Sequence, residues 1–423
     1  MIKVFLNVDE PIKPIVKYSW ELFCKHYKFK TEYVNINHDI SIGFNASNTI
    51  EISKTFYDLI SNANYHHSSF FKQEPVIFNQ SNKKDYLSTA FYLINSIQEY
   101  KSKNLDSIKR FTYKGSFQEK FSCIEKDIVS NYFEKLKENI PVLKKIKTTN
   151  KKSRFFISHD NDSFYGSLIQ DGFWALKKGR IDIILKLIVL ETLKKPTWFN
   201  LNKIMDINDE HGVKSTFFWL VNKGPATKNI NNSDYNINSK KNQTAIAEIN
   251  KRGFFNGLHK SISKETFDTE LKKTSFNAVS NRNHYLKFSL PEHYLLLHNS
   301  KIKIDFSLGF AEHFGFRNSY GLPFKPFNLK SSKPFKFLEV PLHIMDTTFH
   351  TYLKTKKKVT KNLIIDFLDK NKSEKILSIL WHNKFFTPYK FNGYLNIYKT
   401  ILKYFKEEEI MPINQKEILN SYR

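Results

Sequence analysis

The segment Arg154-Phe-Phe-Ile-Ser-His-Asp-Asn-Asp162 decides the fold of this 423-residue chain. An apolar run that ends in carboxylates is typical of a buried strand whose carboxyl end carries chemistry. Asp160 and Asp162 can divide the work, since one carboxylate can bind a cation while the other takes a proton from water. The alternative is an Asx turn that opens a helix near Phe164.

Six further apolar segments follow along the chain, and helical patterns such as residues 181–193 and 244–251 lie between most of them. The seven predicted strands span residues 154–158, 215–221, 254–259, 277–280, 302–306, 337–342 and 376–381. Strands that alternate with helices indicate a parallel sheet. We therefore expect an α/β protein whose main part is a distorted (β/α) barrel of about seven parallel strands.

Residues 1–147 predict a separate, smaller α/β domain of unknown role. Residues 2–6 have the pattern of a strand, residues 14–24 begin a helix, and apolar residues from Leu87 to Ile97 recur at helical spacing. The polar segment 146–153 would link this domain to the barrel domain, residues 148–423. The long segment 222–243 is expected to be a binding loop or disordered.

Polar side chains fall at the predicted strand ends. His259 ends the third strand, Arg282 follows the fourth, Asp305 lies near the end of the fifth, and His382 follows the seventh. At such positions a histidine can bind a metal or act as a general acid, and an arginine can orient a carboxylate base. Taken singly, each also has a structural interpretation, as a buried, satisfied histidine or a surface arginine.

Composition narrows the class of protein. The net charge of +26 raises the possibility of nucleic-acid binding, but the lysines are spread along the chain, so we expect a solvated surface and no nucleic-acid partner. The longest apolar stretch, residues 181–193, is interrupted by charges and too short to span a membrane. Cys24 and Cys123 form no framework, which favours a reducing, cytoplasmic compartment.

The order of the motifs resembles that of the polysaccharide deacetylases, the NodB-homology group of carbohydrate esterases, in a bacterial branch with an extra N-terminal α/β domain. The resemblance covers about residues 154–404, and the N-terminal part is similar in general pattern only, with residues 91–100 and Arg110-Phe111 as its best phrases. The phrases that carry it are Ser158-His-Asp-Asn-Asp162, Lys214-Ser-Thr-Phe-Phe218, Gly257-Leu-His-Lys-Ser261, Arg282-Asn-His-Tyr-Leu286, the segment from Asp305 to Arg317, and Leu380-Trp-His-Asn383.

The resemblance implies metal-dependent hydrolysis of an N-acetyl group on a saccharide, with a divalent cation, often zinc, as cofactor. It matches Asp160 to the general base, Asp162 and His259 to metal ligands, and Arg282 to the residue that orients the base. Asp305 falls in a motif that supports the catalytic groups, and His382 matches the general acid.

The sequence departs from the family at one ligand. Ser263 stands where the family has a second histidine, and a catalytic zinc normally has three protein ligands. His284 or His313 would supply the third, with His284 preferred. The alternatives are a degenerate deacetylase fold that binds saccharide without hydrolysis, and a basic nucleic-acid-binding protein.

Overall fold

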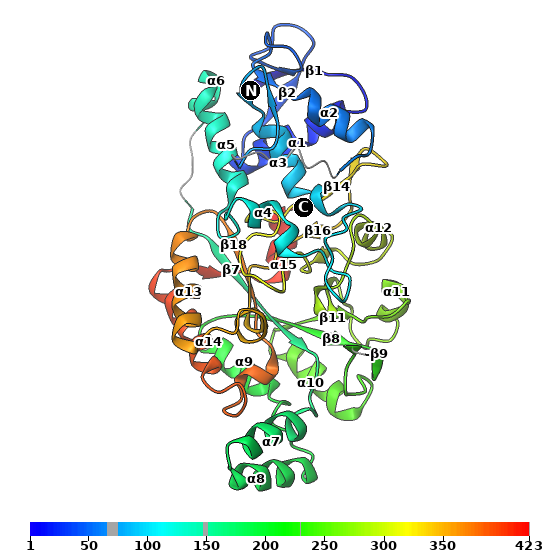
Figure 1. The fold of residues 1–423 in the computed structure, drawn as a ribbon, viewed down its shortest axis with the longest axis vertical. Helices are drawn as coiled ribbons and strands as arrows, with labels where there is room; N and C mark the ends of the chain where they lie inside the picture. The colour runs from blue at the N-terminus through cyan, green and yellow to red at the C-terminus, as the bar shows by residue number, and fades with distance from the viewer. Residues whose placement is uncertain (66–74, 147–150, 229, 423) are drawn as a thin grey trace.

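A computed structural model describes residues 1–65, 75–146, 151–228 and 230–422. The chain is elongated, with the N-terminal sheet at one end and the helices α7 (Ser167–Lys177) and α8 (Ile181–Thr192) at the other (Figure 1). A large parallel sheet lies between them. The predicted domain boundary at 147/148 falls outside the described residues and stays a prediction.

The N-terminal part contains a four-stranded parallel sheet in the order β2-β1-β3-β4. Its strands are β1 (Ile2–Asn7), β2 (Thr31–Tyr33), β3 (Ile40–Gly43) and β4 (Ile50–Glu51). Its helices are α1 (Lys13–Tyr27), α2 (Lys54–Ser61), α3 (Tyr86–Ile94), α4 (Phe117–Lys120), α5 (Ile128–Asn139) and α6 (Pro141–Lys144), and β5 (Asn79–Gln80) pairs with β6 (Lys83–Lys84). The predicted strand at 2–6 and helices at 14–24 and 87–97 correspond to β1, α1 and α3.

The main sheet confirms the expected α/β fold with a distorted parallel barrel. Its strands are β7 (Arg154–Asn161), β8 (Thr216–Leu220), β11 (Phe255–Lys260), β12 (Ser280–Asn283), β13 (Ile304–Asp305), β16 (Leu338–Glu339), β17 (Ile344–Met345), β18 (Ile376–Leu380) and β19 (Met411–Pro412). The order is β16-β13-β12-β11-β8-β7-β18-β17, with β19 also on β7, and every pair is parallel.

The barrel is open between β16 and β17, since no strand pairing joins them within the described ranges. The chain itself bridges this gap: the Leu342 backbone amide donates to the Leu308 carbonyl at 2.9 Å, and the His343 amide donates to the Ser378 carbonyl at 3.1 Å. The prediction missed β17 and β19: unlike β13 and β16, which lie inside longer apolar runs, β17 lies between His343 and Asp346, and β19 contains a proline. It also placed the fourth strand too early, so that Arg282 lies within β12 rather than after it.

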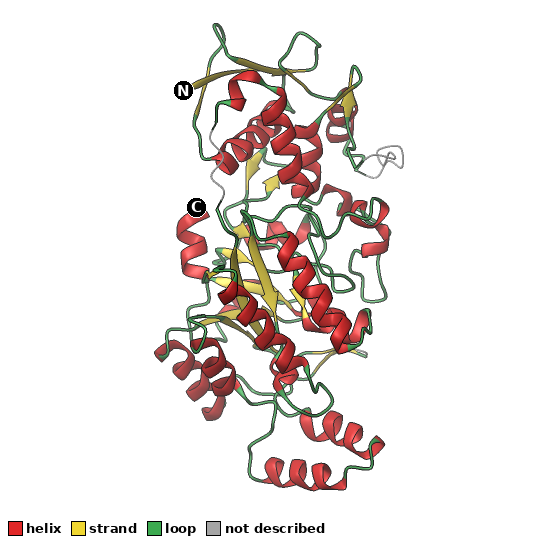
Figure 2. Ribbon diagram, turned by 90° about the vertical axis from the view of Figure 1, so that its left-hand side faces the viewer, coloured by secondary structure: helices red, strands yellow, loops and turns green. Residues whose placement is uncertain are grey.

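Helices cover the sheet on its outer side (Figure 2). They are α9 (Leu201–Asp209), α10 (Lys240–Lys251), α11 (Phe267–Leu271), α12 (Glu292–His298), α13 (Lys357–Lys370), α14 (Tyr394–Glu407) and α15 (Gln415–Tyr422). The segment 222–243 holds the short pair β9 (Pro225–Thr227) and β10 (Ile230–Asn231), and β14 (Phe327–Asn328) pairs with β15 (Lys333–Pro334).

The N-terminal part shares a core with the barrel. One buried apolar cluster runs from Val4 through α1, α3 and α5 to residues such as Leu308 and Phe337. A buried ion pair joins the two parts, since the Arg317 guanidinium donates to the Glu99 carboxylate at 2.6 and 2.9 Å. Packing of this kind holds residues of the N-terminal part at a fixed place beside the barrel.

Candidate active site

Strand alternation selects the side chains that enter the site. Successive residues of a strand point to opposite faces, and β7 is buried over nearly its whole length. Asp160 and Asp162 share the face that lines a cavity of about 230 Å³. His159 points the other way: its Nδ1 lies 2.7 Å from the Trp381 carbonyl and its Nε2 accepts from Asn208 at 3.0 Å. Burial lowers the pKa of His159 to about 4, so this histidine is neutral and structural.

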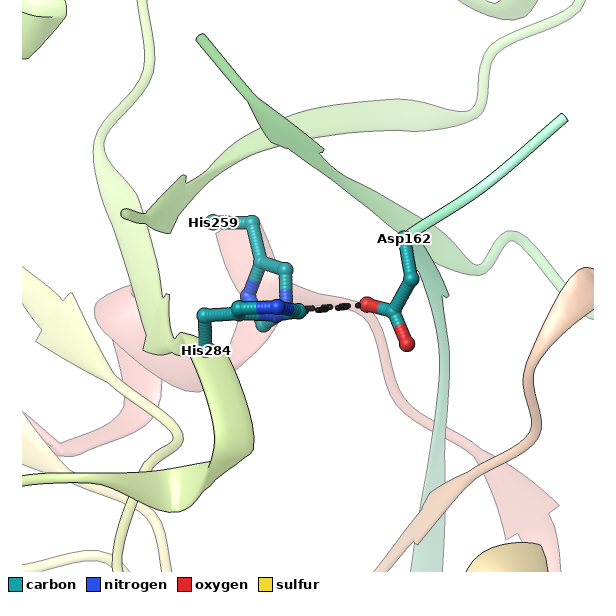
Figure 3. Close-up of side chains that lie close together, drawn as sticks. All are labelled: Asp162, His259 and His284. Carbon is teal, nitrogen blue, oxygen red and sulfur yellow. Dashed lines mark hydrogen bonds and ion pairs between the residues drawn. The ribbon is translucent and has the colours of Figure 1, made fainter. Parts of the chain in front are cut away.

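Three donor atoms meet at one point of this cavity (Figure 3). The Asp162 Oδ1 lies 3.3 Å from the His259 Nε2 and 3.4 Å from the His284 Nδ1, and the two ring nitrogens are 3.0 Å apart. Ligands bound at 2.0–2.1 Å to a tetrahedral zinc lie about 3.3 Å from one another. The spacing of the three atoms therefore fits a zinc-sized cation.

The outer ring nitrogens fix the tautomers of both histidines. The His259 Nδ1 lies 2.8 Å from the Arg282 carbonyl and the His284 Nε2 lies 3.0 Å from the Asn231 carbonyl. Carbonyls only accept, so these nitrogens carry the protons and the inner nitrogens present lone pairs. The Asp162 Oδ1 is buried and has no hydrogen-bond partner among the described residues. These three metal-donor atoms therefore all present lone pairs to one another, and a cation between them would remove their mutual repulsion.

The pKa shifts of the cluster also favour a bound cation. Burial pushes the pKa of the Asp162 carboxyl upward, but His382, His259 and His284 outweigh it and hold that pKa well below its usual value. Burial pushes the pKa of His259 downward, but Asp160 and Asp162 raise it overall. Burial dominates at His284, whose pKa is lowered. The cluster thus keeps its carboxylate ionised and attracts cations.

Asp160 is held by the arginine that the sequence predicted beside it. The Arg282 Nη1 donates to the Asp160 Oδ1 at 3.0 Å and to the Ser158 Oγ at 2.7 Å, and all of the Arg282 side chain is buried. The second oxygen, Oδ2, is 3.6 Å from the His259 Nε2. Asp160 is therefore oriented toward the three-donor cluster without belonging to it.

His382 faces the same centre from the end of β18. Its Nε2 is 3.5 Å from the Asp162 Oδ2, and its Nδ1 is 2.7 Å from the Asp346 Oδ1. The backbone amide of His382 donates to the other oxygen of Asp346 at 2.5 Å. Burial lowers the pKa of His382, but Asp346 and Asp162 raise it overall, which favours the protonated form. We name Asp160, Asp162, His259, His284 and His382 the cavity cluster.

Two residues that the sequence predicted for the site lie outside the cavity. Asp305 does not line the cavity; its Oδ1 accepts from Asn281 and Ser307, and its Oδ2 lies 2.9 Å from the His293 Nε2. The side chain ends in this network because β13 lies two strands beyond β11, on the far side of β12. We name Asp305, Asn281, His293, Ser307 and Glu339 the closed cluster. His313, the other candidate third ligand, packs against Tyr113 away from the cavity.

Three further residues at the site were not predicted as site residues from the sequence, although Arg110 lies in a phrase that carries the resemblance. Asp346 follows the two-residue strand β17, which the pattern did not predict. Lys384 lies in the turn after β18, with its Nζ 3.7 Å from the Asp162 Oδ2. Arg110 comes from the N-terminal part; its guanidinium donates to the Tyr285 carbonyl at 2.8 Å and to the Tyr352 hydroxyl at 3.1 Å. Such partners are far apart in the chain and share no local pattern.

One wall of the cavity is apolar. Leu286, Ala311, Met345 and Leu380 line it and belong to one buried cluster. Tyr285 and Leu286 follow His284 directly and both have positive φ angles, of 58° and 51°. A left-handed backbone is costly for such bulky residues, so the surrounding structure holds this turn in place. The turn sets His284 and the apolar wall side by side.

Comparison with known proteins gives limited similarity. A family model described as a family of unknown function, DUF7033, matches residues 8–145. No curated protein matches the chain.

Solved structures with a similar arrangement include polysaccharide deacetylases of the CE4 family. A protein from Mycobacterium smegmatis assigned to the polysaccharide deacetylases has 12% identity and a TM-score of 0.38, over 64% of this chain and 90% of that one. A CE4 family pseudoenzyme from Bacillus anthracis has 10% identity and a TM-score of 0.34, over 65% and 68%. A polysaccharide deacetylase from Bacillus cereus has 12% identity and a TM-score of 0.31, over 62% and 93%. At such low scores, the assignment of function rests on the residues of this chain.

Proposed function

We propose that this protein is a metal-dependent hydrolase that removes the N-acetyl group from a saccharide. The observation that carries the proposal is the triangle formed by the Asp162 Oδ1, His259 Nε2 and His284 Nδ1, with sides of 3.0, 3.3 and 3.4 Å. Asp162, His259 and His284 would hold the cation. When bound, a divalent cation such as zinc would polarise the acetamide carbonyl and make water more acidic.

The remaining residues of the cavity cluster supply proton transfers. Asp160, fixed by Arg282, takes a proton from the attacking water as the new C–O bond forms. His382 donates its proton to the amine nitrogen as the C–N bond breaks, which yields acetate and a free amine. Asp346 holds the His382 Nδ1–H, so that the Nε2 faces the cavity. The apolar wall of Leu286, Ala311, Met345 and Leu380 suits the acetyl methyl group.

His284 offsets the departure at Ser263. Ser263 lies outside the cavity and donates to the Glu270 carboxylate at 2.8 Å. The third donor comes from a different strand, since His284 directly follows β12. This substitution of one ligand position for another favours a working site over a degenerate one that binds saccharide without hydrolysis.

Metal content and acetate release test the proposal. The purified chain should bind about one zinc, cobalt or nickel ion and release acetate from N-acetylated oligosaccharides. Asp162→Asn and His284→Ala should lose both metal and turnover, because each removes one of three donors. His313→Ala is the matched control, since His313 lies away from the cavity, and it should retain both.

Two outcomes would count against the proposal. Equal metal loss in His313→Ala and His284→Ala would mean that the three-donor cluster is not the metal site. A wild-type chain that holds no metal and releases no acetate from a broad panel would favour saccharide binding without hydrolysis. The cytoplasmic location stays a prediction, and it fits the two buried, unpaired cysteines.

A further inference from the structure

The helices α7 and α8 form a hairpin that projects from the body of the protein (Figures 1 and 2). The side chains between the helices are buried: Ala175, Ile183 and Leu187 pack together with Tyr389. These contacts hold the hairpin together and join it to the segment after β18. The inward side of the hairpin is therefore buried within the protein.

The outward side of the hairpin is also apolar. Its exposed apolar residues are Ile169, Phe173, Leu176, Ile181, Leu185, Ile188, Val189 and Leu193, with exposed fractions from 44% to 76%. A surface helix of a soluble protein normally carries polar residues on this side. A contiguous exposed apolar patch marks a surface that contacts a partner. The proposed catalytic function does not use any of these residues.

Basic residues surround this apolar patch. Lys177, Lys178 and Arg180 lie at the turn between the helices, Lys186 lies on α8, and Lys194 and Lys195 follow it. Two acidic residues lie on α8: Asp182 pairs with Arg180, with 2.6 Å between the Arg180 Nη2 and the Asp182 Oδ2, and Glu191 is half-buried. Apolar side chains ringed by lysines are typical of helices that lie in the headgroup region of a membrane. Each lysine near an anionic bilayer strengthens binding about fivefold.

We propose that the α7–α8 hairpin docks this protein on the surface of an anionic lipid bilayer, with its apolar side inserted at the headgroup boundary. A second copy of the chain is a poorer partner, because pairing two hairpins would bring their lysines together in a protein of net charge +26. The hairpin does not span the bilayer. Within the described residues, no helix is long and apolar enough to cross a membrane.

The hairpin is connected to the strand end that lines the cavity. β7 ends at Asn161 and α7 begins at Ser167, so the hairpin follows the strand end that carries Asp160 and Asp162. The hairpin lies at one end of the molecule and the N-terminal sheet at the other (Figure 1). Docking itself does not depend on the proposed deacetylase activity.

Vesicle binding by the full chain tests this docking. The wild type should sediment with vesicles of phosphatidylcholine and phosphatidylglycerol, bind phosphatidylcholine alone much less, and dissociate as salt rises. The variant Phe173→Ser/Ile181→Ser/Leu185→Ser should partition at least about tenfold less, because three exposed apolar side chains are lost. The matched control is Ile36→Ser/Val359→Ser, which changes exposed apolar residues elsewhere and should bind as the wild type does.

Charge and self-association are separate arms of the test. Lys177→Gln/Lys178→Gln should weaken binding to anionic vesicles by roughly 25-fold and leave binding to neutral vesicles unchanged. Sedimentation velocity without vesicles should give a monomer for the wild type and for both hairpin variants. Equal binding of the triple serine variant and the wild type would overturn the proposal. A wild-type dimer that the triple variant abolishes would also overturn it, because the hairpin would then bind a second copy.

Discussion

The cavity cluster and the closed cluster both combine aspartate with histidine, but they differ in how the carboxylate oxygens are hydrogen-bonded. Both are largely buried, with Asp162 half-buried, and most of their residues lie in or next to strands of the main sheet. In the closed cluster, Asp305 accepts hydrogen bonds on both oxygens, from Asn281, Ser307 and His293. In the cavity cluster, the Asp162 Oδ1 has no such partner among the described residues and faces two ring nitrogens.

This difference in hydrogen bonding distinguishes a candidate cation-binding site from a hydrogen-bond network that only supports the fold. A carboxylate whose lone pairs are all used stabilises the fold, whereas one that faces other acceptors beside a cavity is prepared for a cation. Residue type and position at a strand end do not distinguish the two cases. The sequence grouped Asp305 with the catalytic residues for that reason. Substitutions in the two clusters should therefore have different consequences.

The largest effect is expected for Asp160→Asn. The amide keeps the size of the side chain but cannot take a proton from water, so turnover should fall by about 100- to 10,000-fold. Metal content should stay near one per chain, because Asp160 is outside the three-donor triangle. Acetate release and metal analysis on the same sample check both parts. Parallel loss of metal and turnover would instead make Asp160 a ligand.

A smaller effect is expected for Asp346→Asn. Asp346 acts through His382, whose Nδ1 it holds at 2.7 Å, and touches no substrate in this scheme. kcat should fall by roughly 10- to 100-fold, part of the full contribution of a general acid, while KM stays unchanged. Steady-state kinetics separate the two constants. A rise in KM alone would show that Asp346 shapes the binding surface rather than the acid.

In the closed cluster, Asp305→Asn should lower the free energy of unfolding. Asparagine cannot accept from Asn281, Ser307 and His293 together, and an unpaired buried donor costs about 1–3 kcal/mol of unfolding free energy. Metal content of the folded fraction should not change. Denaturant unfolding and metal analysis test this. A variant of unchanged stability that has lost activity would restore Asp305 to the catalytic group, as the sequence predicted.

The smallest effect concerns pH. Burial, and after it the neighbouring Asp305, raise the pKa of the Glu339 carboxyl well above its ordinary 4.5. The folded state then keeps a proton that the unfolded chain releases. Stability from this group is fully present below pH 4.5 and is lost as pH rises toward the folded pKa, at up to about 1.4 kcal/mol per pH unit.

Glu339→Gln should remove that slope, because the amide resembles the protonated acid at every pH. The free energy of unfolding, measured at several pH values above 4.5, should decline less steeply in the variant than in the wild type. Asp171→Asn serves as a comparison outside the two clusters. Burial raises the pKa of Asp171 to about 6, so this variant should reduce the slope only up to about that pH. Identical slopes for Glu339→Gln and wild type would mean that Glu339 is ionised in the folded protein.

Much of the fold could be predicted because it depends on local pattern. Apolar runs such as Phe155–Ile157 predict buried strands, and the spacing of Leu87, Phe91 and Ile94 predicts α3. Strands β17 and β19 were not predicted, since neither lies within a longer apolar run as the equally short β13 and β16 do. Their pairing depends on neighbours distant in the chain.

The sequence by itself determined the alternation of strands and helices, the presence of Asp160 and Asp162 at a strand end, and the apolar character of α8. Only the tertiary structure decided that His284, rather than Ser263 or His313, completes the three donors, that Asp346 holds His382, and that Asp305 is enclosed. The physical reason is that periodicity records which side of its own element a residue occupies. Which atoms meet across the sheet depends on strand order and side-chain direction, and these are fixed only when the whole chain packs.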